Sequence, residues 1–302
     1  MSMINYSGLA TPVLSPVSRF RGILPPQCAL AQIRQCHTAI EDNRFKRGSV
    51  HNTAGRSTAL VGDLHDETRN LSGILRHEGN IDRIMQGQLG LIILGDAVHN
   101  DKAPQEMDSS VQIMQHIFEI IIAARNDNVV YTHGNHDYLP KGIGRAASSG
   151  ATVAQSLLHR QRLTELYGEG YTSLYEQLMN KCPLLAIGRG FAGVHAGPIT
   201  QSMPIEQIEQ LDPADEGNRF VYETQWNRFE EDYGIPNVRR FMQSIGQPDG
   251  MLIVGHEHLQ DGCWVEKIDP QFSIINALGK KFGYALVDNG QVSFVDVGAN
   301  SN

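Results

Sequence analysis

The stretch VVYTHGNHDY, from Val129 to Tyr138, decides the fold of this chain. Its first residues are apolar or favour β-structure, and the run stops abruptly at the polar sequence Gly134-Asn135-His136-Asp137. This pattern predicts a buried strand that breaks into a sharply turned loop. In α/β proteins such loops carry chemistry, because the strand fixes the backbone while the loop exposes side chains. Asn135 and His136 would therefore offer an amide oxygen and an imidazole side by side.

Four other short apolar runs, at 58–62, 89–95, 191–195 and 251–255, are expected to be strands that end in the same way. The potential metal ligands at their ends are Asp63 and His65, Asp96, His195, and His256 with His258. A glycine comes directly before the polar residues at 63, 96, 135 and 256, and it would let the backbone turn tightly toward a shared centre.

Together these ends supply two carboxylates, three or four imidazoles and one amide, which is too many ligands for one ion. They suit two ions about 3.5–4 Å apart, bridged by one carboxylate and a water. Nitrogen and oxygen ligands without a thiolate favour manganese, iron or zinc over calcium or magnesium. Each motif alone would usually be a turn or a structural polar residue, and only their recurrence at successive strand ends predicts a metal centre.

The remaining pattern predicts helices at 29–40, 71–85, 111–124, 151–180, 204–211 and 238–245. LLAIG (184–188) and FAGVH (191–195) are expected to be adjacent strands, and the tail from FSIINAL to VSFVDV is expected to be antiparallel, with a hairpin turn at 288–290. We therefore expect an α/β fold of two facing mixed sheets flanked by helices, with the metal site at strand ends.

The domain organisation expected is a partly ordered N-terminal extension over 1–56 and one catalytic domain over 57–302. Within the extension, the segment 42–56 is basic and rich in turn residues. We expect it to be a loop that packs on the domain, and an arm that binds a substrate or partner is the alternative.

Composition narrows the functional classes. The 302 residues are 41% hydrophobic and 19% charged, which is typical of a soluble globular protein, and the net charge of -8 argues against binding nucleic acid or an anionic membrane. No apolar run has the length of a membrane span, and the N-terminus lacks the pattern of a secretory signal. The scattered cysteines predict reduced thiols, so we expect a cytoplasmic protein, and the oligomeric state stays open. They are Cys28, Cys36, Cys182 and Cys263.

Five motifs in this order resemble the signature of the calcineurin-like metallophosphoesterases: D-x-H at 63–65, G-D at 95–96, G-N-H-D at 134–137, V-H-A-G at 194–197 and G-H-E-H at 255–258. Within that superfamily the chain looks most like the phosphoprotein phosphatase branch. CPLLAIGRGFAGVHAGPI is similar to that branch's strand pair ending in a ligand histidine. EQIEQLDPAD with the later Trp226, and H-x-x-x-x-D-G at 256–262, are similar to segments C-terminal to that strand pair in the branch. The likeness covers 58 to about 297.

The resemblance implies a ligand set for each metal and one shared ligand. By position these are Asp63 and His65 for the first metal, Asp96 as the bridge, and Asn135, His195 and His256 for the second. His258 would complete the first site, as in the G-H-x-H pattern of the wider superfamily.

The resemblance also implies the chemistry. A bridging hydroxide, made available at neutral pH by the metals, would attack phosphorus in line without a covalent intermediate. His136 would protonate the departing oxygen as general acid. Asp96 would take part by bridging the metals, and Asp137 or Asp101 would orient His136.

One motif departs from the phosphoprotein branch. That branch usually has G-D-x-x-D-R-G, whose Asp orients the acid histidine and whose Arg grips the phosphate. Here His99 stands in place of the Asp and Asn100 in place of the Arg. Loss of the Arg should weaken phosphate positioning or move the task elsewhere. The candidates for substrate contact are Arg228, with Arg239 and Arg240 as alternatives, and Asn135 and His99.

These motifs favour hydrolysis of a phosphomonoester by a protein phosphatase acting on phosphoserine or phosphothreonine, with phosphotyrosine left open. The alternative is a nucleotide hydrolase of the diadenosine-tetraphosphatase kind. In that case the insert 138–180 would bind the nucleotide through its basic and aromatic residues, or it would simply pack as helices. Those residues are Lys141, Arg145, Tyr167, Tyr171 and Tyr175. A non-catalytic binding module is a third alternative, which predicts lost ligands or a lost acid histidine, and none is lost.

Overall fold

Short apolar runs form one sheet in which three neighbouring strands are parallel. In the computed structural model, which describes residues 22–53, 55–100, 103, 105–124, 127–139, 150–215, 217–260 and 262–298, this sheet has the order β12-β11-β3-β4-β5. Its parallel strands are buried throughout, as expected for strands covered on both faces. The strands are β3 (Thr58–Val61), β4 (Gly90–Ile93), β5 (Val129–Tyr131), β11 (Gly283–Asp288) and β12 (Gln291–Asp296).

A second, mixed sheet packs against the first and has the order β1-β2-β6-β7-β8-β10-β9. In it β7 and β8 run parallel, so that their carboxyl ends lie at the same edge. The strands are β1 (Lys46–Arg47), β2 (Val50–Asn52), β6 (Leu185–Gly188), β7 (Phe191–Val194), β8 (Met251–Val254), β9 (Val265–Asp269) and β10 (Phe272–Ile275).

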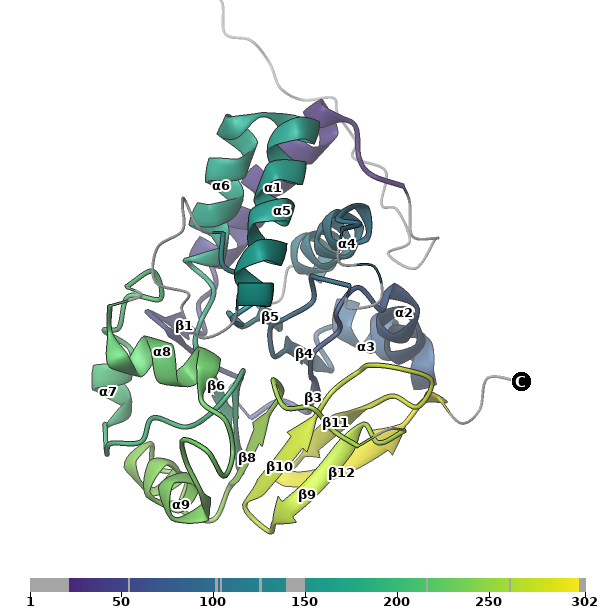
Figure 1. The fold of residues 1–302 in the computed structure, drawn as a ribbon. Helices are drawn as coiled ribbons and strands as arrows, with labels where there is room; N and C mark the ends of the chain where they lie inside the picture. The colour runs from purple at the N-terminus through teal and green to yellow at the C-terminus, as the bar shows by residue number, and fades with distance from the viewer. Residues whose placement is uncertain are drawn as a thin grey trace, which may run out of the picture.

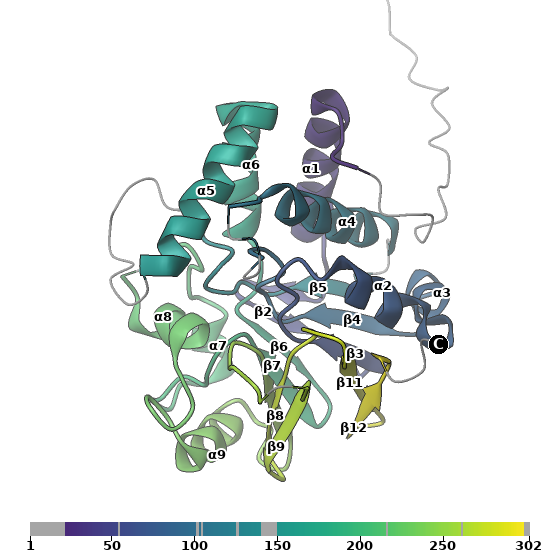
Figure 2. The same ribbon diagram turned by 45° about the vertical axis from the view of Figure 1, so that its right-hand side comes forward.

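Helices cover the outer faces of both sheets, as Figures 1 and 2 show. On the side of the first sheet, apolar side chains of several helices join those of β3, β4 and β5 in one core. These helices are α1 (Pro26–Glu41), α2 (Thr68–Arg76), α3 (Asn80–Met85), α4 (Asp108–Ala124), α5 (Gly150–Tyr167) and α6 (Glu169–Met179), and the short η1 (His77–Gly79) between α2 and α3 has no buried residue. The other sheet has α7 (Ile205–Ile208), α8 (Arg219–Trp226) and α9 (Ile235–Ser244).

The two sheets are joined by an apolar layer and by contacts at their ends. Leu60 and Ile92 of the first sheet belong to the same buried cluster as Phe191 and Ile253 of the second. Beyond that layer, Asp63 forms a β-bridge with Asn276, which follows β10. The strand ends that carry the predicted ligands are thereby held at one place.

The predicted α/β fold of two facing mixed sheets flanked by helices is confirmed, and the differences have local causes. The predicted helix 71–85 is broken at Glu78, which has a φ of 47°. The helical region 151–180 divides at Gly168, whose φ of 81° ends α5. The strands β1, β2 and β9 and the helix α8 were not predicted, and β1 and β2 lie in the segment 42–56 that was expected to be a loop.

The predicted tail was wrong in one respect. β10 pairs parallel with β8 and antiparallel with β9 in the seven-stranded sheet, while β11 and β12 form an antiparallel hairpin in the other sheet. The hairpin turn is confirmed, because Asn289 and Gly290 both have positive φ. Sequence order suggested one meander, but β10 is buried along its length and so takes an interior position.

Segment 22–56 packs closely on the rest of the chain. The buried face of α1 joins the helical core, and β2 pairs in parallel with β6 inside the larger sheet. The residues before 22 lie outside the described part of the chain. The boundary at 56 between an extension and a catalytic domain stays a prediction.

His51 on β2 gives the fold a testable dependence on pH. It is 2% exposed, and burial, together with the positive charges of Arg56 and Lys46, lowers its pKa from 6.5 to about 4. The unfolded chain binds this proton below pH 6.5 and the folded chain does not, so the free energy of unfolding should fall as the pH falls.

Between pH 7 and pH 5 the free energy of unfolding of the wild-type protein should fall. We expect this fall to be about 2 kcal/mol smaller in His51→Gln. Urea denaturation of both proteins at the two pH values, with a chelator present, measures this difference. Equal losses in the two proteins would contradict the assignment of a neutral, buried His51.

Candidate metal centre

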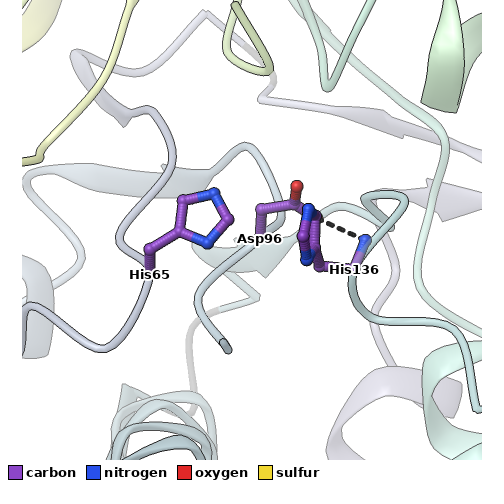
Figure 3. Close-up of side chains that lie close together, drawn as sticks. All are labelled: His65, Asp96 and His136. Atoms are coloured by element: carbon purple, nitrogen blue, oxygen red, sulfur yellow. Dashed lines mark hydrogen bonds between the residues drawn. The ribbon is translucent and has the colours of Figure 1, made fainter. Parts of the chain in front are cut away.

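The predicted ligands converge because the parallel strands of both sheets end at one edge. Asp63 and His65 follow β3, Asp96 follows β4, Asn135 and His136 follow β5, His195 follows β7 and His256 follows β8. Two groups of side chains there have ligand atoms within 4.8 Å of one another. They are His65, Asp96 and His136, shown in Figure 3, and Asp96, His195 and His256. Asp96 belongs to both groups.

In the first group the histidine rings are fixed by their Nδ1 atoms. His65 Nδ1 lies 3.1 Å from the Val98 carbonyl oxygen and 3.0 Å from that of His99, which directs Nε2 toward Asp63 Oδ2 at 3.9 Å. The ring of His136 meets that of His65 edge-on, with centroids 4.9 Å apart. The backbone N–H of His136 donates to Asp96 Oδ1 at 2.9 Å (Figure 3).

The second group is more deeply buried than the first. His195 is fully buried, and its Nδ1 lies 2.7 Å from the Leu94 carbonyl oxygen. Its Nε2 therefore faces Asn135 Oδ1 at 2.9 Å and Asp96 Oδ2 at 3.3 Å. His256 Nε2 and Asp96 Oδ2 are buried without a hydrogen-bond partner among the described residues.

These features fit divalent metal ions. Metal-binding histidines usually donate their second ring N–H to a carbonyl or carboxylate, as His65 and His195 are placed to do. A buried carboxylate oxygen and imidazole nitrogen without partners cost free energy that a bound cation would recover. The set contains oxygen and imidazole donors and no thiolate, which suits manganese, iron or zinc.

Backbone groups hold both carboxylates in place. The N–H of His256 donates to the two Asp63 oxygens at 2.9 and 3.0 Å, so an amide of one sheet's loop fixes the carboxylate of the other. A Cβ on Gly255 would lie 2.2 Å from Asp63 Oδ1, and one on Gly134 would lie 2.2 Å from Asp96 Oδ1. The predicted tight turn holds for the glycine at 95, with a φ of 87°. At 134 and 255 the reason is close approach to a carboxylate.

The electrostatics of the centre depend on burial. Burial, reinforced by the charge of Asp96, raises the pKa of Asp63 to about 6. Burial would also raise the pKa of Asp96, but the His195 and His136 imidazoles hold it well below its usual range. Burial alone would lower the pKa of His195, and the two carboxylates instead raise it to about 9. The two carboxylates thus favour positive charge beside them, as the raised pKa of His195 shows.

The surroundings of His258 and His99 differ from those expected of a metal ligand and a substrate contact. His258 is exposed and belongs to neither ligand group in the described part of the chain, so a role as metal ligand stays a prediction. His99 is fully buried, with its Nδ1 2.7 Å from His136 Nδ1, so it lies behind His136, and its contact with substrate stays a prediction. Asp101 lies outside the described residues.

Asp137 ties the loops together. Its Oδ2 accepts from the backbone N–H of Asp96 at 3.1 Å and of Gly134 at 2.8 Å, and its Oδ1 accepts from the Tyr131 hydroxyl at 2.5 Å. Burial raises its pKa to about 7, with Asp96 adding to the effect. These bonds of Asp137 fix the loops after β4 and β5, and a direct role in orienting His136 stays a prediction.

Of the predicted arginines, Arg228 lies nearest the ligands. Its Nη1 is 3.2 Å from Glu257 Oε2 and 3.5 Å from the His256 carbonyl oxygen, and its side chain is 34% exposed. Arg239 pairs with Asp269, and Arg240 bonds the Thr200 carbonyl.

Comparison with known proteins agrees with this geometry. A sequence model of the calcineurin-like phosphoesterase family matches residues 57–260, which is more than half of the chain. The chain belongs to the calcineurin-like phosphoesterases. Members of this family typically bind a dinuclear metal centre, and the two groups around Asp96 are its candidates here. No functionally curated protein matches this phosphoesterase by sequence.

Two solved structures share the fold at low identity. A protein serine/threonine phosphatase from Saccharomyces cerevisiae aligns with a TM-score of 0.68 and 14% identity, over 92% of this chain and 91% of its own. A cold-active protein-tyrosine phosphatase from a psychrophilic Shewanella species aligns with a TM-score of 0.58 and 11% identity, over 85% of this chain and 84% of its own.

None of the described helices is long and apolar enough to cross a membrane.

The contact between Gly255 and Asp63 gives a prediction about metal binding. Gly255→Ala should displace the Asp63 carboxylate, because the added Cβ would lie 2.2 Å from its Oδ1. We expect Mn²⁺ affinity to fall about 10- to 100-fold, as for loss of a group that orients a ligand. Titration calorimetry measures the affinity.

Gly170→Ala on α6 is the matched control, because a Cβ there meets nothing within 4 Å. It should leave Mn²⁺ affinity unchanged and keep or raise stability. Unchanged affinity in Gly255→Ala as well would show that Asp63 is not a ligand in the position described.

Proposed function

We propose that this phosphoesterase is a metal-dependent phosphomonoesterase that removes phosphate from phosphorylated proteins, at phosphoserine or phosphothreonine and, with the altered clamp, also at phosphotyrosine. The observation that carries the proposal is Asp96, a buried carboxylate shared by two ligand groups, one of which includes His136. At their low identities the two phosphatases named above support the fold, and they suggest which phosphorylated residues to test.

The proposed ligands divide around Asp96. Asp63 and His65 would hold one ion, and Asn135, His195 and His256 the other, with Mn²⁺ the first candidate and iron or zinc the alternatives. When bound, the two ions would supply Lewis-acid charge for the phosphoryl oxygens and lower the pKa of water.

His136 is proposed as the general acid. Its Nδ1 lies 2.7 Å from His99 Nδ1, and we propose that Nε2 gives the proton to the departing oxygen. The ring lies beside His65 and Asp96, on the loop that directly follows β5. Its backbone N–H bond to Asp96 keeps the acid and the shared carboxylate in one fixed geometry.

Arg228 is proposed to contact the phosphate in place of the arginine that the sequence lacks at 100. It is next to the His256 loop and partly exposed, and its Nη1 pairs with Glu257 Oε2 at 3.2 Å. A guanidinium can form paired hydrogen bonds with phosphate oxygens. Asn135 is 4% exposed and bonded to His195, so we propose it as a metal ligand before a substrate contact.

The nucleotide-hydrolase alternative loses its proposed support. Tyr171 and Tyr175 are 3% and 1% exposed and belong to the helical core. Tyr167 bonds Gln115 and the Leu24 carbonyl, and its ring packs on that of Tyr171 with centroids 4.5 Å apart. Tyr171 and Tyr175 therefore pack helices, and Tyr167 is partly buried against them. Two basic residues of the insert, at 141 and 145, lie outside the described part of the chain.

The test is phosphate release by protein stripped with a chelator and reloaded with Mn²⁺. The substrates are phosphoserine, phosphothreonine and phosphotyrosine peptides, beside diadenosine tetraphosphate. We expect metal-dependent turnover of the peptides and a loss of about 10²- to 10⁴-fold in His136→Ala. His37→Ala, which removes an imidazole from α1 and leaves the site alone, should retain activity.

Two results would contradict the proposal. Turnover of diadenosine tetraphosphate alone would assign a nucleotide hydrolase. Silence on every substrate, with Mn²⁺, iron and zinc each tried, would make the retained ligands structural. Including His258→Ala in the same series decides whether that exposed histidine binds metal, because a ligand should lose metal content together with activity.

A further inference from the structure

Behind His136 lies a row of buried polar rings that the proposed mechanism has not used. His99 Nδ1 is 2.7 Å from His136 Nδ1, and the His99 ring meets that of His159 edge-on, with centroids 6.0 Å apart. The His159 ring in turn meets that of Tyr175, with centroids 5.5 Å apart. His159 lies on α5 and Tyr175 on α6, so the helical insert supplies the far end of the row.

The row is buried and incompletely bonded. His99, His159 and Tyr175 are each at most 1% exposed. His99 Nε2, both ring nitrogens of His159 and the Tyr175 hydroxyl have no hydrogen-bond partner among the described residues. Each such atom costs roughly 1–3 kcal/mol, so apolar side chains would stabilise the fold better if packing were their only task.

A metal site does not explain the row. The described residues include no third histidine, cysteine or carboxylate whose ligand atom groups with those of His99 and His159. A hydrogen-bonded row would explain it: the ring centroids of His99 and His159 are 6.0 Å apart, and one bridging water between the rings would give His99 Nε2 a partner. Burial lowers the pKa of His159 to about 3, so its ring is neutral and has one nitrogen that accepts.

The direction of the hydrogen bonds then matters for His136. Two Nδ1 atoms 2.7 Å apart share one hydrogen, so one ring donates and the other accepts. If His136 donates from Nδ1, it can release the proton on Nε2 to the departing oxygen and end as a neutral ring with its hydrogen on Nδ1. That arrangement requires a bare Nδ1 on His99, whose hydrogen must then be on Nε2 and needs an acceptor.

We propose that His159 is that acceptor and is a positioning residue: through His99, it fixes the ring nitrogen of His136 from which the leaving oxygen receives its proton. This inference rests on the proposed function and extends it to a helix outside the metal-binding loops. Without an acceptor at 159, His99 would change tautomer and carry its hydrogen on Nδ1. It would then present a hydrogen-bond donor to His136 Nδ1. His136 would then have to keep its own hydrogen on Nε2.

The test uses leaving groups that differ in their need for an acid. Phenyl phosphate releases a basic oxygen that must be protonated, whereas 2,4-dinitrophenyl phosphate releases a weakly basic one that need not be. We expect His159→Phe to lower kcat about 10-fold or more on phenyl phosphate, with KM and Mn²⁺ content unchanged, and to leave the dinitrophenyl ester unaffected. His159→Gln, which keeps an acceptor, should restore much of the loss.

Leu163→Val, at a buried position one turn along α5, is the matched packing control and should affect the two esters equally. Equal loss on both esters in His159→Phe, or no loss on either, would overturn the inference while wild-type turnover upholds the proposed function. If the wild-type protein releases phosphate neither from these esters nor from the phosphopeptides, the proposed function fails first, and the inference falls with it.

A second readout needs no turnover. In ¹⁵N-labelled, metal-free protein, NMR of the histidine rings reports which nitrogen carries hydrogen. We expect the His99 hydrogen on Nε2 in the wild-type and His159→Gln proteins and on Nδ1 in His159→Phe. A His99 hydrogen on Nδ1 in the wild-type protein would overturn the proposed direction.

Discussion

The structure depends on two carboxylates buried beside each other. Asp63 and Asp96 follow neighbouring parallel strands, and burial together with their mutual repulsion raises the pKa of Asp63 to about 6. Two such charges are tolerated in a dry site only if cations or hydrogen-bond donors surround them. The loops supply two such donors, the backbone N–H groups of His136 and His256. The remaining positive charge beside the carboxylates comes from imidazoles and, in our proposal, from metal ions.

The hydrogen bonds that hold these carboxylates also join the two sheets. The His256 amide comes from the seven-stranded sheet, and the Asp63 carboxylate that it bonds comes from the five-stranded one. Asp137 makes a similar connection within the first sheet, between the loops after β4 and β5. Glycines 134 and 255 exist at these crossings because a side chain there would overlap a carboxylate. The site is therefore part of what holds the fold together, and changes to its scaffold should alter metal affinity before they alter the helices.

Much of this could be predicted from the sequence, because strand ends leave local marks. A short apolar run followed by glycine and a potential ligand predicts its own position, and the ends at 63, 96, 135, 195 and 256 do meet. The position of β10 could not be predicted, because pairing in parallel with β8 depends on partners far along the chain. His159 could not be found either: it is one histidine in a helix with no motif, and only the packing of α5 brings it to His99. The burial of His99 was missed for the same reason. His99 stands in place of the second Asp of the G-D-x-x-D-R-G motif, and that position did not show that its side chain is buried.

The most direct test of the central claim is the number of Mn²⁺ ions bound and their magnetic coupling in Asp96→Asn compared with the wild-type protein. The account predicts two ions per wild-type chain, coupled in the electron paramagnetic resonance spectrum as expected for ions about 3.5–4 Å apart, and weakened binding of both in Asp96→Asn. A single uncoupled ion in the wild-type chain, or one ion retained at full affinity in the variant, would contradict a centre built around a shared carboxylate.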